Sequence, residues 1–185
     1  GAQAWAERYD VELVDFFALQ DQITESVVAA IEPQLYAAEH LRLRSRQPES
    51  LDAWGFVMRA MPHVWTWGSE KDIETAQGLL KQAKDIDPDY ARANSLLAWT
   101  HAARVQLGWG DPRQELAAAL AMAQSAIERE PEDPWGRLAA GYVHMVARRS
   151  RPAVAELTDS IDRNPSFALA HVILGSTFGY AGMPE

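Results

Sequence analysis

Three aspartates in the stretch "DIDPDYARAN", which begins at Asp85, stand at alternate positions and suggest calcium chemistry. A helix–loop–helix calcium site starts with such a triplet, but it also needs glycine at its sixth position and glutamate at its twelfth. Here Tyr90 and Leu96 occupy those two positions. The sequence therefore predicts that these carboxylates face solvent and cap helices, and no calcium site is predicted.

Three histidines, His63, His101 and His144, recur at one position of an internal pattern and suggest a ladder of metal ligands. Successive helix pairs lie on the order of 10–20 Å apart, given an interaxial spacing of about 8–10 Å. Zinc requires nitrogen ligands at about 2 Å, so one ion cannot join histidines from different pairs. We expect packing histidines and no metal site.

Other reaction chemistry is missing from the sequence. It contains no glycine-rich phosphate loop, no His-Glu-x-x-His motif, no serine nucleophile elbow and no cysteine. Two basic clusters, "HLRLRSR" and "RRSR", suggest either a phosphate site or cations near the carboxyl ends of helices, and we favour the helix ends. The sequence thus predicts no catalytic residue and no cofactor, although an enzyme with an unrecognised site stays an alternative.

Composition indicates a globular protein. The chain has 185 residues, 48% of them hydrophobic, and a net charge of −9. The negative charge argues against nucleic acid and against an anionic membrane as partners. No apolar run reaches about 18 residues and no signal peptide is visible, so we expect a cytoplasmic protein. The last residues, "YAGMPE", resemble the start of a further helix, and we expect a fragment of a longer protein.

The elements that carry these side chains repeat along the chain. Pro131 and Pro165 are 34 residues apart, whereas Pro88 and Pro131 are 43 apart, which is one period plus nine inserted residues. Small residues stand ten residues after each proline and five before it: Ala98, Gly141 and Gly175, and Ala83, Ala126 and Ser160. A period near 34 with helical patterns on both sides of the turn is typical of helical repeats.

The pattern predicts an all-α fold with two regions, 1–50 and 51–185. In the first, apolar residues recur every four positions from Leu19 to Leu35, which predicts a long amphipathic helix over 15–44 with a kink at Pro33. In the second region we expect helices at 51–67, 69–86, 90–107, 112–129, 134–148, 152–163 and 166–181. We place the nine inserted residues around "VQLGWGDPRQ", and we expect Asp89, Asp133 or Ser166 to cap the helix after each proline.

These positions resemble the tetratricopeptide repeat (TPR). The third repeat matches at Gly141, Ala153, Leu157 and Pro165, the second at Ala98, Ala119, Ala126 and Pro131, and the first at Ala76, Leu80, Ala83 and Pro88. Ala123 departs from the pattern where a large residue is usual, and Ser160 replaces an alanine. The resemblance implies antiparallel helix pairs stacked into a superhelix, with about three repeats and the first helix of a fourth.

The resemblance also implies a concave groove for a protein or peptide partner. Mapped onto this sequence, its lining includes Trp54, Met61, Trp65, Arg92, Trp99, Trp135, Tyr142, Met145 and Tyr180. This strip is aromatic, rich in methionine and poor in charge, which suits an apolar peptide or helix. Three interpretations stay open: a groove free for a partner, a groove filled by the chain's own N-terminal segment, and ordinary core packing.

The N-terminal string "ERYD…FALQDQI" resembles the segment before such repeats in bacterial class III adenylate or guanylate cyclases. It is also similar to segments in some winged-helix transcription regulators. The resemblance implies a non-catalytic interaction and regulatory module of a bacterial signalling protein, with a sensory or scaffold module of a transcription regulator as the alternative. The apolar stripe of 15–44 further suggests a homodimer through that helix.

Overall fold

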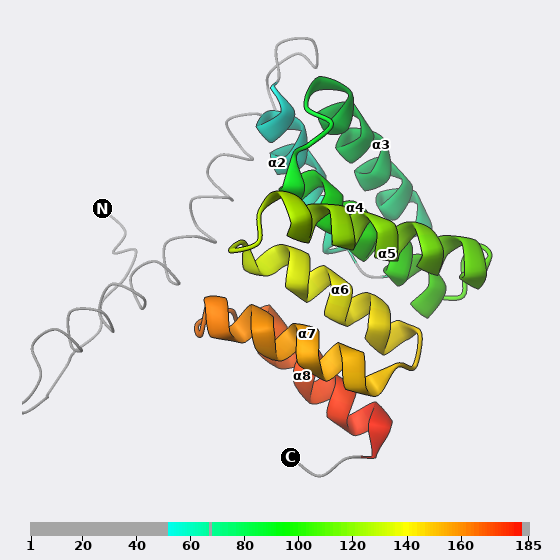
Figure 1. Ribbon diagram of the computed structural model, residues 1–185. Helices are drawn as coiled ribbons and strands as arrows, with labels where there is room; N and C mark the ends of the chain where they lie inside the picture. The colour runs from blue at the N-terminus through cyan, green and yellow to red at the C-terminus, as the bar shows by residue number, and fades with distance from the viewer. Residues whose placement is uncertain (1–51, 67, 183–185) are drawn as a thin grey trace, which may run out of the picture.

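The computed structural model describes residues 52–66 and 68–182, and within them the fold is all-helical (Figure 1). The described residues contain seven α-helices and no strand. In chain order these are α2 (Ala53–Val64), α3 (Glu70–Ile86), α4 (Ala91–Gln106), α5 (Pro112–Arg129), α6 (Pro134–Val146), α7 (Ser150–Arg163) and α8 (Ala168–Ala181). The seven helices predicted from the sequence are confirmed, with ends shifted by a few residues.

Consecutive helices pack as antiparallel neighbours. His63 near the end of α2 contacts Asp72 near the start of α3, and Arg129 at the end of α5 pairs with Asp89 just before α4. The pairs α2 with α3, α4 with α5 and α6 with α7 hold most of the contacts, while α2, α4, α6 and α8 touch one another in that order. The first helix of each pair therefore contacts the first helix of the next.

The three repeated prolines lie in the turns between pairs. Pro88 separates α3 from α4, Pro131 separates α5 from α6, and Pro165 separates α7 from α8. The repeated small residues are buried at five of six positions, where they let helices approach closely: Ala83, Ala98, Ala126, Gly141 and Ser160. The sixth, Gly175 on α8, is exposed and has open space around it.

The predicted caps after the prolines are correct at one position and wrong at two. Asp133 accepts a hydrogen bond from the Trp135 amide and caps α6. Asp89 and Ser166 do not cap the helices that follow them, because α4 and α8 have no side-chain cap hydrogen bond. Instead, the backbone amides of Asp89 and Ser166 donate to the residue before each proline. Asp87 Oδ1 and Asn164 Oδ1 are the acceptors, each closing a turn around the proline.

The inserted residues lie around "VQLGWGDPRQ", as predicted, but most of them lengthen the facing ends of α4 and α5 and only a few lengthen the turn itself. Helix α4 has 16 residues and α5 has 18, whereas α6 has 13 and α7 has 14. The turn between α4 and α5 holds Gly108 and Gly110, both with positive φ, where glycine avoids a steric cost. The second helix pair is therefore the longest of the three.

Asp111 caps the longest helix, and its loss has a measurable effect. Its carboxylate accepts from the amides of Arg113 and Gln114, ahead of Pro112 at the first helical position. We expect Asp111→Ala to lower the free energy of unfolding by about 1 kcal/mol, the usual effect of removing such a cap. Asp89→Ala, which removes only an exposed ion pair with Arg129, should cost less than about 1 kcal/mol. Urea unfolding of both variants tests this, and equal losses would contradict it.

Several sequence-based predictions fall outside the described residues. These are the amphipathic helix over 15–44, its kink at Pro33, the homodimer through that helix and the basic cluster "HLRLRSR". The boundary between regions 1–50 and 51–185 is likewise untested and stays a prediction. Among the helices that the structure describes, none is both long and apolar enough to cross a membrane.

Candidate functional site

Five aromatic rings form a continuous ladder through the middle of the fold. We call Trp65, Trp99, Tyr142, Trp135 and Phe167 the aromatic ladder. All of them except Phe167 are predicted groove residues. Trp65 follows α2, Trp99 lies on α4, Trp135 and Tyr142 both lie on α6, and Phe167 precedes α8. Because the rings come from α2, α4, α6 and α8 or from the ends of these helices, the ladder ties the helix pairs to one another.

The geometry of the ladder is that of favourable ring pairs. Trp99 stacks on Tyr142 with ring centroids 4.0 Å apart and 23° between the planes. Trp65 meets Trp99 edge to face at 5.5 Å and lies 6.0 Å from Trp135, which in turn lies 5.0 Å from Phe167. Offset and edge-to-face pairs at such distances add about 0.5–1.5 kcal/mol each beyond the burial of their area.

Burial divides the predicted groove residues into three groups. Trp99, Trp135 and Tyr142 are 2%, 8% and 0% exposed, and Met145 is buried with them. Met61 and Trp65 are half-buried and pack against the hydrophobic core. Trp54 and Tyr180 are exposed, at 37% and 59%. The buried rings belong to the core, so only part of the predicted strip is accessible at the surface.

Arg92 holds the charged edge of the ladder. Its guanidinium lies 4.7 Å from the centre of the Trp135 ring, and its Nη2 lies 3.3 Å from Asp133 Oδ1. Both side chains of the ion pair are largely buried, at 18% and 13% exposure. The arginine thus joins the start of α4 to the cap of α6, and it contributes packing and a cation–π contact together with its charge.

Tyr142 combines a buried ring with a satisfied hydroxyl. Its Oη donates to Oε1 of Gln106, the last residue of α4. Burial raises the pKa of the Tyr142 phenol above its ordinary value, because the phenolate would lose its hydration there. The hydroxyl therefore stays protonated over the physiological pH range and acts as a hydrogen-bond donor.

Tyr180 lies on α8, at the C-terminal end of the predicted strip, and its ring is exposed. The Arg148 guanidinium lies 5.0 Å from the centre of its ring. Together they border a shallow pocket of about 160 Å³ with Val105, Gln106, Met145 and Val146. Trp54 lies on α2 at the other end of the row of first helices. The two exposed aromatic residues of the predicted groove are therefore widely separated along the chain of repeats.

The repeated histidines serve packing and pairing. His63 Nδ1 lies 2.6 Å from Asp72 Oδ1, and His101 Nδ1 lies 2.5 Å from Glu115 Oε2. Hydrogen bonds from Ser69 and then from His63 lower the pKa of the Asp72 carboxyl. Within the described part of the chain, no group of three or more potential metal ligands gathers.

The basic cluster "RRSR" was predicted at the carboxyl end of a helix, and only its first residue lies there. Arg148 follows the C-cap residue of α6, whereas Arg149 is the N-cap residue of α7 and Arg151 lies in the first turn of α7. Arg148 and Arg149 follow Ala147, the C-cap residue of α6, and Arg148 adopts a positive φ of 59° at the turn into α7. Phe167, Gln106 and the pairing of Arg92 with Asp133 also belong to this site and were not predicted from the sequence. Phe167 precedes α8 in the turn after Pro165, where Tyr90 follows Pro88, and that correspondence is the signal that could have found it.

Comparison with known proteins gives one informative relative. The chain is 32% identical over 137 residues to a protein of Rhizobium meliloti (strain 1021) described as "Putative adenylate cyclase 3". The match covers 74% of this chain and 23% of that protein, so the chain corresponds to about a quarter of the relative's length. No family model matches the chain, and no solved structure matches it.

Proposed function

We propose that this chain is a TPR-like array that binds a protein partner within a cyclase-type signalling protein. The observation that carries the proposal is the burial of small residues at equivalent positions in both helices of each pair. Ala60 and Ala76, Ala98 and Ala119, and Gly141 and Ala153 stand at equivalent positions, and all are buried. Stacking of such pairs builds a superhelix whose first helices line a binding face.

The partner chemistry follows from the accessible residues of that face. Trp54 and Tyr180 present large apolar rings at the surface, and few other large hydrophobic side chains are as exposed among the described residues. Exposed aromatic residues are enriched among those that dominate binding energies. An apolar or amphipathic segment of another polypeptide is the partner that such a surface fits, as in docking of a helix into a hydrophobic groove.

The cyclase connection rests on the relative described as an adenylate cyclase, of which this chain matches only a part. We infer that the matched part regulates or assembles the protein and performs no reaction itself. In support, the residues of the ladder are aromatic and apolar, and the ionisable pairs around it link helices to one another. The alternative, a sensory or scaffold module of a winged-helix transcription regulator, rests on the N-terminal string alone.

Cyclic nucleotide assays test the proposal. The 185-residue chain should form no cyclic AMP or cyclic GMP from ATP or GTP, whereas the full-length protein from the same gene should form one of them. Trp54→Ala with Tyr180→Ala in the full-length protein should abolish the response of that activity to its partner. Ile86→Ala, which removes another exposed apolar side chain away from the ladder, is the matched control.

Three outcomes would contradict the proposal. Turnover by the chain alone would show that it is an enzyme. A DNA-binding domain in place of a cyclase domain in the full-length gene product would favour the regulator. If Ile86→Ala reduced the response to the partner as much as the double variant does, Trp54 and Tyr180 would not form the binding surface.

A further inference from the structure

The third repeat lacks a carboxylate that the first two repeats place beside their histidines. Asp72 and Glu115 stand four residues before the buried Ala76 and Ala119, and each pairs with the histidine of its own repeat. The residue four positions before Ala153 is Arg149. Where two repeats hold an anion against a histidine, the third holds a cation.

His144 therefore has no internal partner for its Nδ1. This atom is buried and makes no hydrogen bond within the described residues, whereas the same atom of His63 and of His101 contacts a carboxylate. Burial lowers the pKa of the His144 imidazole, Glu156 opposes that shift, and Arg149 adds to it. A buried polar atom without a partner costs free energy, so a ligand that supplies an acceptor here gains that energy on binding.

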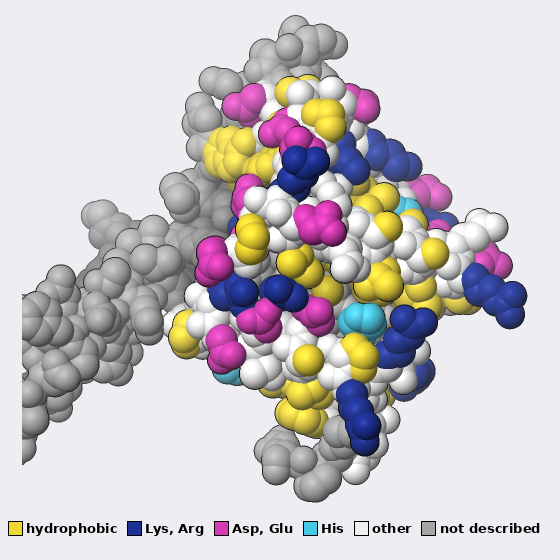
Figure 2. Space-filling model, viewed as in Figure 1, with side chains coloured by type: hydrophobic (Ala, Val, Ile, Leu, Met, Phe, Trp, Pro, Cys, Tyr) yellow, Lys and Arg dark blue, Asp and Glu magenta, His cyan; other side chains and the backbone are white. Residues whose placement is uncertain are grey.

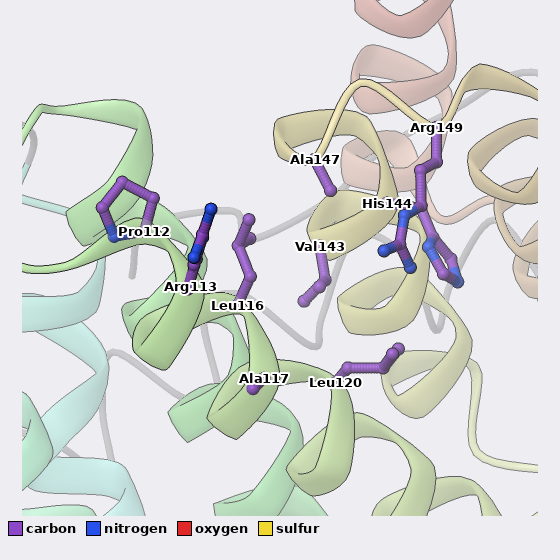
Figure 3. Close-up of a pocket in the computed structure, with 9 residues that line it drawn as sticks. All are labelled: Pro112, Arg113, Leu116, Ala117, Leu120, Val143, His144, Ala147 and Arg149. Carbon is purple, nitrogen blue, oxygen red and sulfur yellow. The ribbon is translucent and has the colours of Figure 1, made fainter.

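A pocket of about 420 Å³ opens beside this histidine, between the start of α5 and the end of α6. Figure 3 shows its apolar side chains, Leu116, Leu120 and Val143, between Arg113 on the α5 side and His144 with Arg149 on the other. None of the residues that line the pocket is acidic. Figure 2 shows the same surface, where hydrophobic side chains between α5 and α6 have a histidine and basic side chains beside them.

We propose that this pocket binds a small organic acid with an apolar body, whose carboxylate takes the place that Asp72 and Glu115 occupy in the first two repeats. Arg149 and the His144 ring donate to the carboxylate, and the body lies on Leu116, Leu120 and Val143. Arg149 is exposed and its guanidinium lies beside the ring in Figure 3, so the ligand reaches the ring by moving a surface side chain.

The size and polarity of the pocket favour a small molecule over a polypeptide. Its volume lies within the range of about 300–1,000 Å³ that is usual for small-molecule sites. Such sites combine an apolar lining with a few polar groups that fix orientation, as here. The pocket shares no residue with the aromatic ladder and does not depend on the cyclase connection, so its ligand can be tested independently of the proposed function.

Titration of the 185-residue chain with octanoate tests the proposal. We expect octanoate to shift the NMR signals of the His144 ring and to raise its pKa, because a bound anion favours the imidazolium. The other charged groups that face this ring or its pocket are Arg113 on α5, Arg149 just before α7 and Glu156 on α7, and they are the same with and without octanoate. Acetate, which lacks the body, and 1-octanol, which lacks the charge, should each bind at least about tenfold more weakly, equivalent to about 1.4 kcal/mol.

A charge reversal supplies the sharpest variant. Arg149→Glu restores the carboxylate of the first two repeats, so it should pair with His144, raise the pKa of that ring without ligand, and weaken octanoate binding at least about tenfold. Arg151→Glu makes the same charge change at an exposed position of α7 outside the pocket lining and should leave binding nearly unchanged. His144→Gln keeps a polar side chain of similar length and should also weaken binding.

Several results would overturn the proposal. Equal binding of octanoate and 1-octanol would reduce the site to an apolar patch. Unchanged octanoate affinity in both Arg149→Glu and His144→Gln would place the ligand elsewhere, and equal losses in Arg149→Glu and Arg151→Glu would indicate non-specific attraction to positive charge. Binding of acidic peptides but of no small acid would assign the pocket to a polypeptide partner instead.

Discussion

Trp99→Ala is expected to lower the free energy of unfolding by about 3–5 kcal/mol, the usual cost of deleting a large buried aromatic side chain. Trp99 is 2% exposed, stacks on Tyr142 and meets Trp65 edge to face. Its removal leaves a void against two rings that are fixed by their own helices. Since single domains have a total stability of about 5–15 kcal/mol, the variant should be close to unfolding at 37 °C.

Trp54→Ala is the matched control for that experiment. Trp54 lies on α2 and is 37% exposed, so truncation leaves no closed cavity. Chemical denaturation followed by circular dichroism gives both free energies. A loss at Trp99 no larger than at Trp54 would mean that the ladder is not the packed core that its geometry indicates.

Gly141→Ala should also destabilise the fold, by about 1–3 kcal/mol, because the added methyl group overpacks the core. A Cβ at this position would lie 2.5 Å from Leu157 Cγ and 3.3 Å from the backbone oxygen of Ala153. Leu157 is fully buried, so it has no free space into which to retreat. The gain of about 1 kcal/mol that alanine usually brings over glycine within a helix offsets part of this cost.

Gly175→Ala isolates the two effects. Gly175 stands at the same repeat position in α8, but it is exposed and nothing lies within 4 Å of an added Cβ. Alanine should therefore stabilise α8 by up to about 1 kcal/mol. Thermal unfolding of the two variants gives the comparison. Shifts of the same sign would show that helix propensity, and not the contact with Leu157, governs position 141.

The helices and their turns could be predicted because their signals are local. Pro88, Pro131 and Pro165 end helices by removing a donor and fixing φ, and they do so in any packing arrangement. The buried alanines recur because two helices can approach closely only where side chains are small. Asp133 was predicted as a cap for the same reason, since an N-cap bond joins residues two or three apart in sequence.

The turn acceptors and the burial of the aromatic rings were not predicted, because they depend on competing local bonds or on contacts between distant segments of the chain. Asp87 and Asn164 accept from the amides of Asp89 and Ser166, because an aspartate or asparagine side chain can close a turn two residues ahead, and this turn competes with the predicted capping. Burial of Trp99 and Tyr142 follows from α4 meeting α6, and aromatic residues at helical spacing look alike whether they lie in a core or in a groove. The sequence therefore predicted which residues line the row of first helices, but it did not decide whether their rings are buried or exposed.

The pocket beside α5 shows a different limit. Its lining joins the start of one helix to the end of the next, and nothing in the sequence of either helix alone marks it. The exchange of a carboxylate for Arg149 can be read from the aligned repeats, but it was not among the predictions made from the sequence. Only the structure shows the consequence of this exchange: His63 and His101 contact the carboxylates of Asp72 and Glu115, whereas His144 Nδ1 has no partner within the described residues.

The sequential pattern of helix contacts also bears on how the molecule folds and opens. Each described helix touches mainly those one or two places away in the chain, and among the described helices α8 packs mainly on α7 and α6. Short loops between interacting helices keep the entropy cost of loop closure low, so such a topology can fold quickly from neighbouring helical hairpins. In such a chain of contacts, the folding cooperativity between two helices weakens with their separation along the chain. Fraying of α8 therefore need not spread to α4 and α5, and the backbone amides of α4 and α5 should exchange most slowly with solvent.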